Sequence, residues 1–159
     1  MYELFTSQYE TIKSARHALF AYCASLNNDD LFKKTPVFND STISYLLLHN
    51  ANTYISWLNN FGLDGSIAFH NIEDVKALND IKLIYEQVDQ IVADFLKKYS
   101  DDYSQSLTKH IARKGISLSL TPLQLFTHVI THEFHHKGQI LTMSRLLGYT
   151  PVDTDVIRF

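Results

Sequence analysis

The sequence contains very little cysteine, proline or glycine. Cys23 is the single cysteine among 159 residues, which excludes an internal disulfide and any metal site built from several thiolates. Three prolines and five glycines are few for a protein of short strands and tight turns. The scarcity of these residues therefore favours long helices.

Neither a strong excess of positive charge nor a long apolar run is present. A formal net charge of −3 provides no basic surface for phosphates, so nucleic acid is not an expected partner. No stretch of 18 apolar residues occurs, so no membrane association is expected. The polar start, "MYELFTSQYE", does not resemble a signal peptide, and a cytoplasmic location is expected. A length of 159 residues with 45% hydrophobic content predicts a single domain, 1–159, around one core.

Apolar residues recur at steps of three and four in four stretches, as they do in amphipathic helices. The first stretch runs from Phe5 to Leu26 and is ended by "NNDD". The second is predicted to begin near Asp40 or Ser41 and to end at about Asn60. The third, from Leu78 to Tyr99, has the most regular spacing.

The fourth stretch carries signals at both ends. Thr121 is a suitable N-cap, Pro122 suits the first helical position, and Gln124 completes a capping box. Gly148 stands where a left-handed C-terminal cap is expected. Before this helix, the alternating pattern and Gly115 in "HIARKGISLSL" suggest a short β-hairpin. Together these features predict an all-α four-helix bundle, with that hairpin as an addition between the third and fourth helices.

The segment "HVITHEFHHKGQ", residues 128–139, brings four histidines onto the fourth helix. At 100° per residue, His132 and His136 border the apolar face, whereas His128 and His135 lie on a more polar side with Gln124 and Gln139. Two imidazoles one turn apart can share one zinc-like ion. The pair at 132 and 136 is therefore the candidate metal-binding pair.

A third ligand is expected, because open catalytic sites usually have three protein ligands. His49, in "LLLHNANTYISWL", lies at the edge of the apolar arc of the second helix and is the first candidate. His17 on the first helix is the reserve. His70 and His110 fall in connecting segments and are expected to be exposed.

Two known metal motifs partly match this region. The letters "HEFHH" satisfy the zinc-protease pattern H-E-x-x-H, but Gln139 and Thr142 stand where the extended pattern needs glycine and histidine. No glutamate follows Glu133 to serve the other protease version. Glu133 and His136 also form one Glu-x-x-His signature, but a di-iron bundle needs two copies. Neither a peptidase nor a di-iron protein is expected.

Glu133 itself lies within the broad apolar arc of the fourth helix. We expect it to pair with Arg16 or Lys137 or to lie at a subunit contact; the alternative is a catalytic base whose pKa is raised by burial. The arc spans roughly 180°, wider than one core contact requires. This width predicts a homodimer through the fourth helix, unless the hairpin or the C-terminal tail covers the additional face.

These residues together resemble the DinB family: the histidine of "LLLHNANTYISWL", the pair in "THEFHHKGQ" and the terminal "RLLGYTPVDTDVIRF", with similarity over the whole chain. The resemblance implies an up-down-down-up four-helix bundle that binds one divalent metal through His49, His132 and His136. The sequence departs from the family pattern at Lys137, usually Arg, and at Thr131, often Asn.

The resemblance also implies a class of activity. The superfamily includes thiol S-transferases that join a low-molecular-weight thiol, such as bacillithiol, to small electrophiles in detoxification or stress responses. Three neutral histidines would leave zinc or nickel its full double charge, which favours the thiolate form of a bound thiol. Two alternatives remain: a metal-dependent hydrolase with Glu133 or a neighbouring carboxylate as base, and a non-catalytic, damage-inducible metal-binding protein. Cys23, on the core side of its helix, is expected to act only as a small hydrophobic residue.

Overall fold

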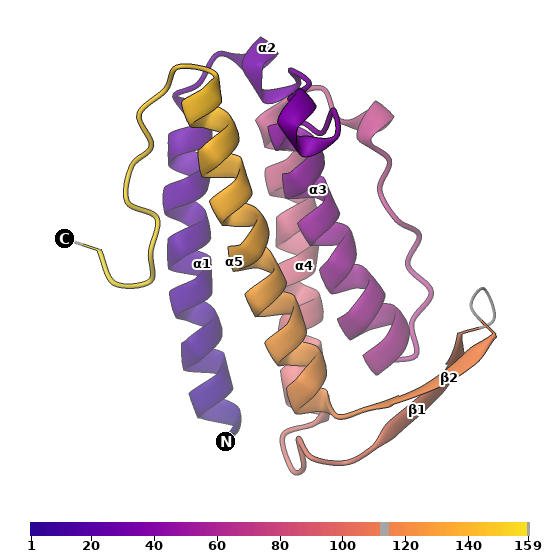
Figure 1. Cartoon of the computed structure of the whole chain (residues 1–159). Coiled ribbons are helices and arrows are strands. Elements are labelled where there is room, and N and C mark those ends of the chain that lie inside the picture. The colour runs from indigo at the N-terminus through magenta and orange to yellow at the C-terminus, as the bar shows by residue number, and fades with distance from the viewer. Residues whose placement is uncertain (112–114, 159) are drawn as a thin grey trace.

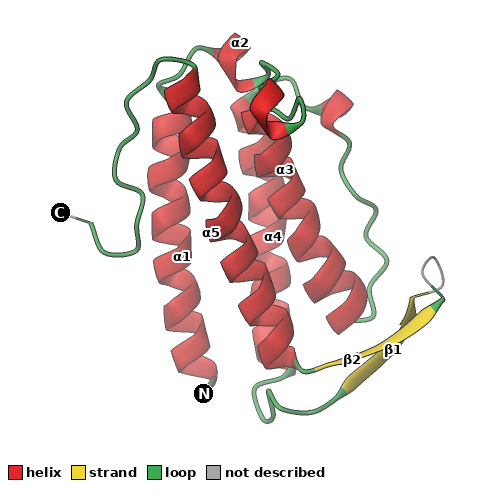
Figure 2. Cartoon of the chain, in the orientation of Figure 1, coloured by secondary structure: helices red, strands yellow, loops and turns green. Residues whose placement is uncertain are grey.

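The computed structural model describes residues 1–111 and 115–158 and is mostly helical, with one two-stranded hairpin (Figure 2). Within this part of the chain, no helix combines the length and apolar character that crossing a bilayer requires. The α-helices are α1 (Tyr2–Ala24), α2 (Asn28–Leu31), α3 (Ile43–Tyr54), α4 (Leu78–Lys98) and α5 (Pro122–Leu146); the strands are β1 (Leu107–Ile111) and β2 (Ile116–Leu120). Two 3₁₀ turns, η1 (Pro36–Phe38) and η3 (Ile72–Asp74), and a π-helix, η2 (Ile55–Gly62), complete the described elements.

The four long helices lie side by side along one common direction (Figure 1). Helix α3 packs against both α4 and α5, and α1 packs against α4. The connection 63–77 returns along the outside of the molecule to the end at which α3 begins, so α4 runs in the same direction as α3 (Figure 1). Their inward faces form one continuous apolar core, in which Tyr54, Phe95 and Phe126 are among the largest fully buried side chains.

The start and end of α5 agree with the sequence prediction. The Thr121 hydroxyl accepts from the Gln124 amide at 3.1 Å, and the Gln124 side chain accepts from the Thr121 amide at 2.8 Å, so the capping box is confirmed. Gly148 follows the helix with φ +94°, the left-handed conformation expected of it. These short-range signals are therefore sufficient to define the helix that carries four of the histidines.

The second predicted helix begins later and ends differently than expected. Thr42 is its N-cap, because the Thr42 hydroxyl accepts from the Tyr45 amide at 3.0 Å, so α3 starts at Ile43 rather than near Asp40. Beyond Tyr54 the chain continues as the π-helix to Gly62. Lys98 donates to the Gly62 carbonyl at 3.2 Å, and the Tyr99 hydroxyl also donates to this carbonyl. The C-terminal end of α4 therefore binds the end of this segment. Wide π turns of this kind are rare and are often found at functional sites.

The other boundaries show smaller differences. Helix α1 ends at Ala24, and "NNDD" does more than end it: the Asn27 side chain accepts from the Asp29 amide at 3.1 Å and caps the short helix α2. The predicted hairpin is confirmed, with Leu107 opposite Leu120 and Ile111 opposite Ile116. Part of its predicted sequence, residues 112–114, lies outside the described residues.

Part of the broad apolar face of α5 is covered within the chain. Phe126 and Ile130 are buried in the core, and Lys137 is buried where its ammonium donates to the Thr154 carbonyl of the C-terminal segment at 2.5 Å. That segment runs alongside the helices (Figure 1). The C-terminal tail thus covers part of the wide apolar arc of α5. This cover was the alternative explanation to a contact with a second subunit. The homodimer stays a prediction, to be tested by sedimentation.

Candidate metal centre

Three histidines from two helices converge on one point. His49 projects from α3, and His132 and His136 project from successive turns of α5. The Nε2 atoms of His49 and His132 are 3.0 Å apart, and one ligand nitrogen from each of the three rings lies within 4.8 Å of the others. Among the residues that the structure describes, this is the one such cluster of metal-ligating side chains.

Packing of α3 against α5 brings the third ring to the pair. His132 and His136 are neighbours by helical spacing, with ring centroids 4.4 Å apart, so α5 alone fixes their relative position. His49 then reaches both rings across the α3–α5 interface, at centroid distances of 5.1 and 4.9 Å. All three side chains are half-buried, so one side of the cluster remains open to solvent.

The surroundings of the cluster favour neutral imidazoles. Burial lowers the pKa of His49 and of His136, and it lowers the pKa of His132 to about 4, with the neighbouring histidines adding to the effect. A protonated ring would have to lose water and to face other potential cations. At neutral pH the rings are therefore in the form that binds metal ions.

Gln139 determines which nitrogen of His136 carries the ring proton. The Nδ1 of His136 lies 2.6 Å from the Gln139 Oε1, which accepts a hydrogen bond, so the ring proton is on Nδ1. The lone pair of His136 is then on Nε2. Outer-shell partners of this kind fix the tautomer and orientation of metal-binding histidines.

The donor set fits a divalent transition metal. Three neutral imidazoles suit zinc, nickel and related ions, whereas magnesium and calcium prefer oxygen ligands. Bonds of about 2.0–2.1 Å place tetrahedral ligand atoms roughly 3.3 Å apart. The 3.0 Å separation of the His49 and His132 Nε2 atoms is close to that spacing, and a ligand nitrogen of His136 lies within 4.8 Å of both rings' ligand nitrogens.

The remaining histidines lie outside this cluster. His17, the reserve third ligand, is exposed on α1 and is not part of the group formed by the other three, in which His49, the first candidate, stands as the third member. His128 and His135 are exposed and flank the cluster, and the His128 ring packs edge-on against Trp57 of the π-helix at 5.3 Å. His110 is exposed, as expected, but His70 is half-buried because its backbone exchanges two hydrogen bonds with Asn52.

Glu133 points away from the cluster, into the core. Its carboxylate accepts from Arg16 at 2.8 and 2.9 Å and from the Tyr54 hydroxyl at 2.6 Å. Pairing with Arg16, one of the two expected partners, is therefore confirmed. Because Glu133 is buried and both of its oxygens are bound in this way, the geometry does not favour a role as base.

The sequence analysis placed Gln139 only on the more polar side of its helix and missed its contact with the cluster. A local signal was available, because residues three apart on a helix are neighbours and Gln139 follows His136 by three. The contact of Tyr45, one turn before His49, with the His49 ring was missed in the same way. The Tyr45 ring stacks on the His49 ring with centroids 6.1 Å apart and an interplanar angle of 12°.

Comparison with known proteins agrees with this geometry. The model of the DinB family matches residues 1–159. The chain is also similar to an uncharacterized protein, YizA, of Bacillus subtilis (strain 168), with 27% identity over 142 residues that cover 89% of this chain and 87% of YizA.

Proposed function

Because this chain belongs to the DinB family, we propose that His49, His132 and His136 hold one divalent metal ion, zinc or nickel, and that the protein is a thiol S-transferase. The transfer would join a low-molecular-weight thiol, such as bacillithiol, to a small electrophile. The observation that carries the metal site is the convergence of three half-buried imidazole nitrogens within 4.8 Å. The reaction class rests on the family together with the chemistry of this donor set.

The proposed reaction balances without an additional oxidant or reductant. With an alkyl chloride, R–SH and R′–Cl give R–S–R′, a proton and chloride. The sulfur–carbon bond forms as the carbon–chlorine bond breaks and chloride leaves with the electron pair. The metal ion, when bound, would supply a positive charge that favours the thiolate, which is the nucleophilic form of the thiol.

The chain's own residues prepare the site for this chemistry. Three neutral ligands contribute no negative charge, unlike thiolates or carboxylates. Gln139 holds the proton of His136 on Nδ1 and leaves the lone pair of Nε2 free to bind a metal ion. The thiol must come from a substrate, because Cys23 is fully buried and burial raises its pKa to about 12.

Hydrolysis is less well supported. Glu133 was the candidate base for that reaction, and its carboxylate is bound by Arg16 and Tyr54 on the core side of α5. A base in this position would have to break a buried ion pair before taking a proton from a water molecule in the cluster.

We further infer that the four long helices form an up-down-down-up four-helix bundle. The parallel course of α3 and α4 and the long connection 63–77 support this topology (Figure 1). In such a bundle the three histidines belong to facing helices, the usual position of a metal site in this architecture.

The transferase is tested by coupling bacillithiol to 4-nitrobenzyl chloride with zinc-loaded and nickel-loaded protein. We expect formation of the thioether above the blank rate, and loss of that increase in His49→Ala and His132→Ala. His17→Ala, which removes an exposed histidine of α1, is the matched control and retains full activity. No increase over the blank with several thiols and both metals would contradict the proposed reaction while leaving the metal site to be tested separately.

A further inference from the structure

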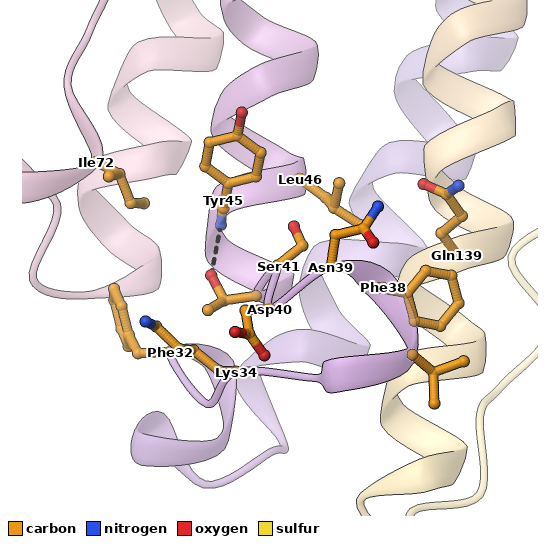
Figure 3. Close-up of a pocket in the computed structure, with 12 residues that line it drawn as sticks. Phe32, Lys34, Phe38, Asn39, Asp40, Ser41, Tyr45, Leu46, Ile72 and Gln139 are labelled. Carbon is orange, nitrogen blue, oxygen red and sulfur yellow. Dashed lines mark hydrogen bonds between the residues drawn. The ribbon is translucent and has the colours of Figure 1, made fainter.

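A large cavity lies beside the histidine cluster, at the end of the molecule where α3 begins. Its volume is about 720 Å³, within the range of pockets that bind small organic molecules. Tyr45 and Leu46 of α3 border it, the loop 32–42 surrounds it, and Gln139 reaches it from α5 (Figure 3). Both helices that carry the three histidines therefore contribute residues to the cavity.

Two side chains connect the cavity to the cluster. Gln139 lines the cavity and also accepts the hydrogen bond from His136 at 2.6 Å. Tyr45 lines it as well, and its ring is stacked on His49. A molecule in the cavity would touch residues that contact two of the three histidines directly.

The loop that surrounds the cavity has an unusual backbone. Asn39 and Asp40 are consecutive non-glycine residues with φ of 52° and 56°, in the left-handed region. A bridge between Thr35 and Ser41 closes the loop around them. Strained conformations of this kind are often found at binding sites, where the surrounding structure holds them in place.

The buried hydroxyls of Thr35 and Ser41 in this loop have no hydrogen-bond partner among the described residues. The Ser41 hydroxyl is buried and makes no hydrogen bond, and Ser41 lines the cavity. A buried hydroxyl without a partner costs free energy that a bound group could recover. A rotation of the Ser41 side chain toward the cavity would give this hydroxyl a partner on a bound ligand.

We propose that this cavity binds an uncharged organic molecule with an aromatic or alicyclic ring. Half of its twelve lining residues are apolar, and Lys34 and Asp40 provide one charge of each sign, so the lining does not select a ligand of net charge. The apolar side chains that would enclose the ring are Phe32, Val37, Phe38, Tyr45, Leu46 and Ile72.

The identity of this molecule rests on the proposed function: if the protein is a thiol S-transferase, the molecule in the cavity is the electrophile that accepts the thiol. A thiol such as bacillithiol carries several charged and hydroxyl groups, and these would gain no hydrogen bond from the six apolar side chains of the lining. The ring of an acceptor would instead be enclosed by the apolar side chains. Its polar group would bind Ser41, and its reactive end would face Gln139 and the cluster.

The experiment uses 4-nitrobenzyl alcohol, an unreactive analogue of the chloride, with ¹⁵N-labelled full-length protein in the absence of metal. We expect amide signals from loop 32–42 and from Tyr45 to shift saturably. In Val37→Glu and in Ile72→Glu the Kd should rise roughly tenfold or more, because a carboxylate in the wall must lose water when the ring binds. Val37 is 79% exposed, so its substitution leaves the fold intact even if Ile72→Glu perturbs it.

Leu83→Glu is the matched control, because Leu83 is 55% exposed on α4 and does not line the cavity. Its Kd should equal that of the unchanged protein. An unchanged Kd in Val37→Glu, or shifts confined to residues outside the cavity, would overturn the proposal. Binding without thioether formation would uphold the cavity and contradict only the transferase, whereas thioether formation with an unaltered KM in Val37→Glu would uphold the transferase and overturn the cavity.

Discussion

Arg16 of α1 and Glu133 of α5 form a two-point ion pair in the core, with Nε–Oε1 and Nη2–Oε2 distances of 2.8 and 2.9 Å. The pair joins helices far apart in sequence and holds the core-facing side of α5 against α1. Asp89 also accepts from Arg16 at 2.7 Å, and the Tyr85 ring faces the guanidinium at 4.5 Å. Glu133 immediately follows His132, so the same turn of α5 contributes to both the core and the cluster.

Removal of Glu133 should destabilise the protein strongly. Glu133→Ala leaves Arg16 buried with only Asp89 to balance its charge, and breaking a buried pair costs about 3–5 kcal/mol. Urea unfolding followed by circular dichroism measures the loss. Glu86→Ala, at an exposed site on α4, should change stability by less than about 0.5 kcal/mol. A loss equally small in Glu133→Ala would show that the ion pair contributes little to the fold.

The three histidines should determine metal content. Each of the changes His49→Ala, His132→Ala and His136→Ala should weaken zinc binding by roughly 100-fold or more, because two imidazoles remain where three are needed. Isothermal titration with zinc and elemental analysis of the purified protein measure this effect. His110→Ala, at an exposed strand position, should bind zinc normally. Full zinc binding in any of the three variants would remove that residue from the site.

Gln139 should influence the metal without binding it. Gln139→Ala removes the acceptor that holds the His136 proton on Nδ1, and losses of this type reduce affinity about 10–100-fold. Gln139→Glu keeps an acceptor in the same place and should restore most of the affinity. Gln90→Ala, at an exposed site on α4, should have no effect. If Gln139→Ala bound zinc with unaltered affinity, the hydrogen bond would have no role in metal binding.

Cys23 should be unreactive in the folded protein. Burial raises the pKa of its thiol to about 12, with Lys82 opposing the shift slightly. Reaction with a disulfide reagent at pH 8 should therefore be slow until urea unfolds the chain. The thiol of the unfolded chain has a pKa of about 9, whereas that of the folded protein has a pKa of about 12. Between these two pH values the unfolded state binds fewer protons than the folded state. The free energy of unfolding therefore falls as the pH rises through this range. Cys23→Ala should reduce that decline, as urea unfolding at pH 8 and pH 10 would show; an identical decline would contradict it.

Asp40 should tolerate glycine and resist a β-branched residue. Its φ of 56° costs a side chain about 1–2 kcal/mol when the residue is branched, whereas glycine adopts this conformation without penalty. Asp40→Val should lower the free energy of unfolding by that amount, and Asp40→Gly should maintain or raise it. Thermal melting of the two variants provides the measurement. Equal stability of both would mean that the loop relaxes to a different backbone conformation.

The sequence alone predicted several local features correctly. The capping box of Thr121 and Gln124, the left-handed Gly148, the hairpin and the pairing of His132 with His136 along one face all depend on residues close in the chain. Helix and turn geometry is fixed over a few residues, so spacing is sufficient to predict such contacts. Resemblance to the DinB family and the helical wheel then favoured His49 as the third member.

Only the tertiary structure decided how distant segments meet. It brings His49 to residues 83 and 87 positions later, selects Arg16 over Lys137 as the partner of Glu133, and places the C-terminal segment over Lys137. The π-helix after Tyr54 also depends on packing, because Lys98 of α4 binds its last carbonyl. The cavity beside the cluster depends on packing as well, because its lining residues come from three separate segments of the chain. Side-chain spacing defines one face of one helix, whereas the partner of that face depends on how all the helices pack together.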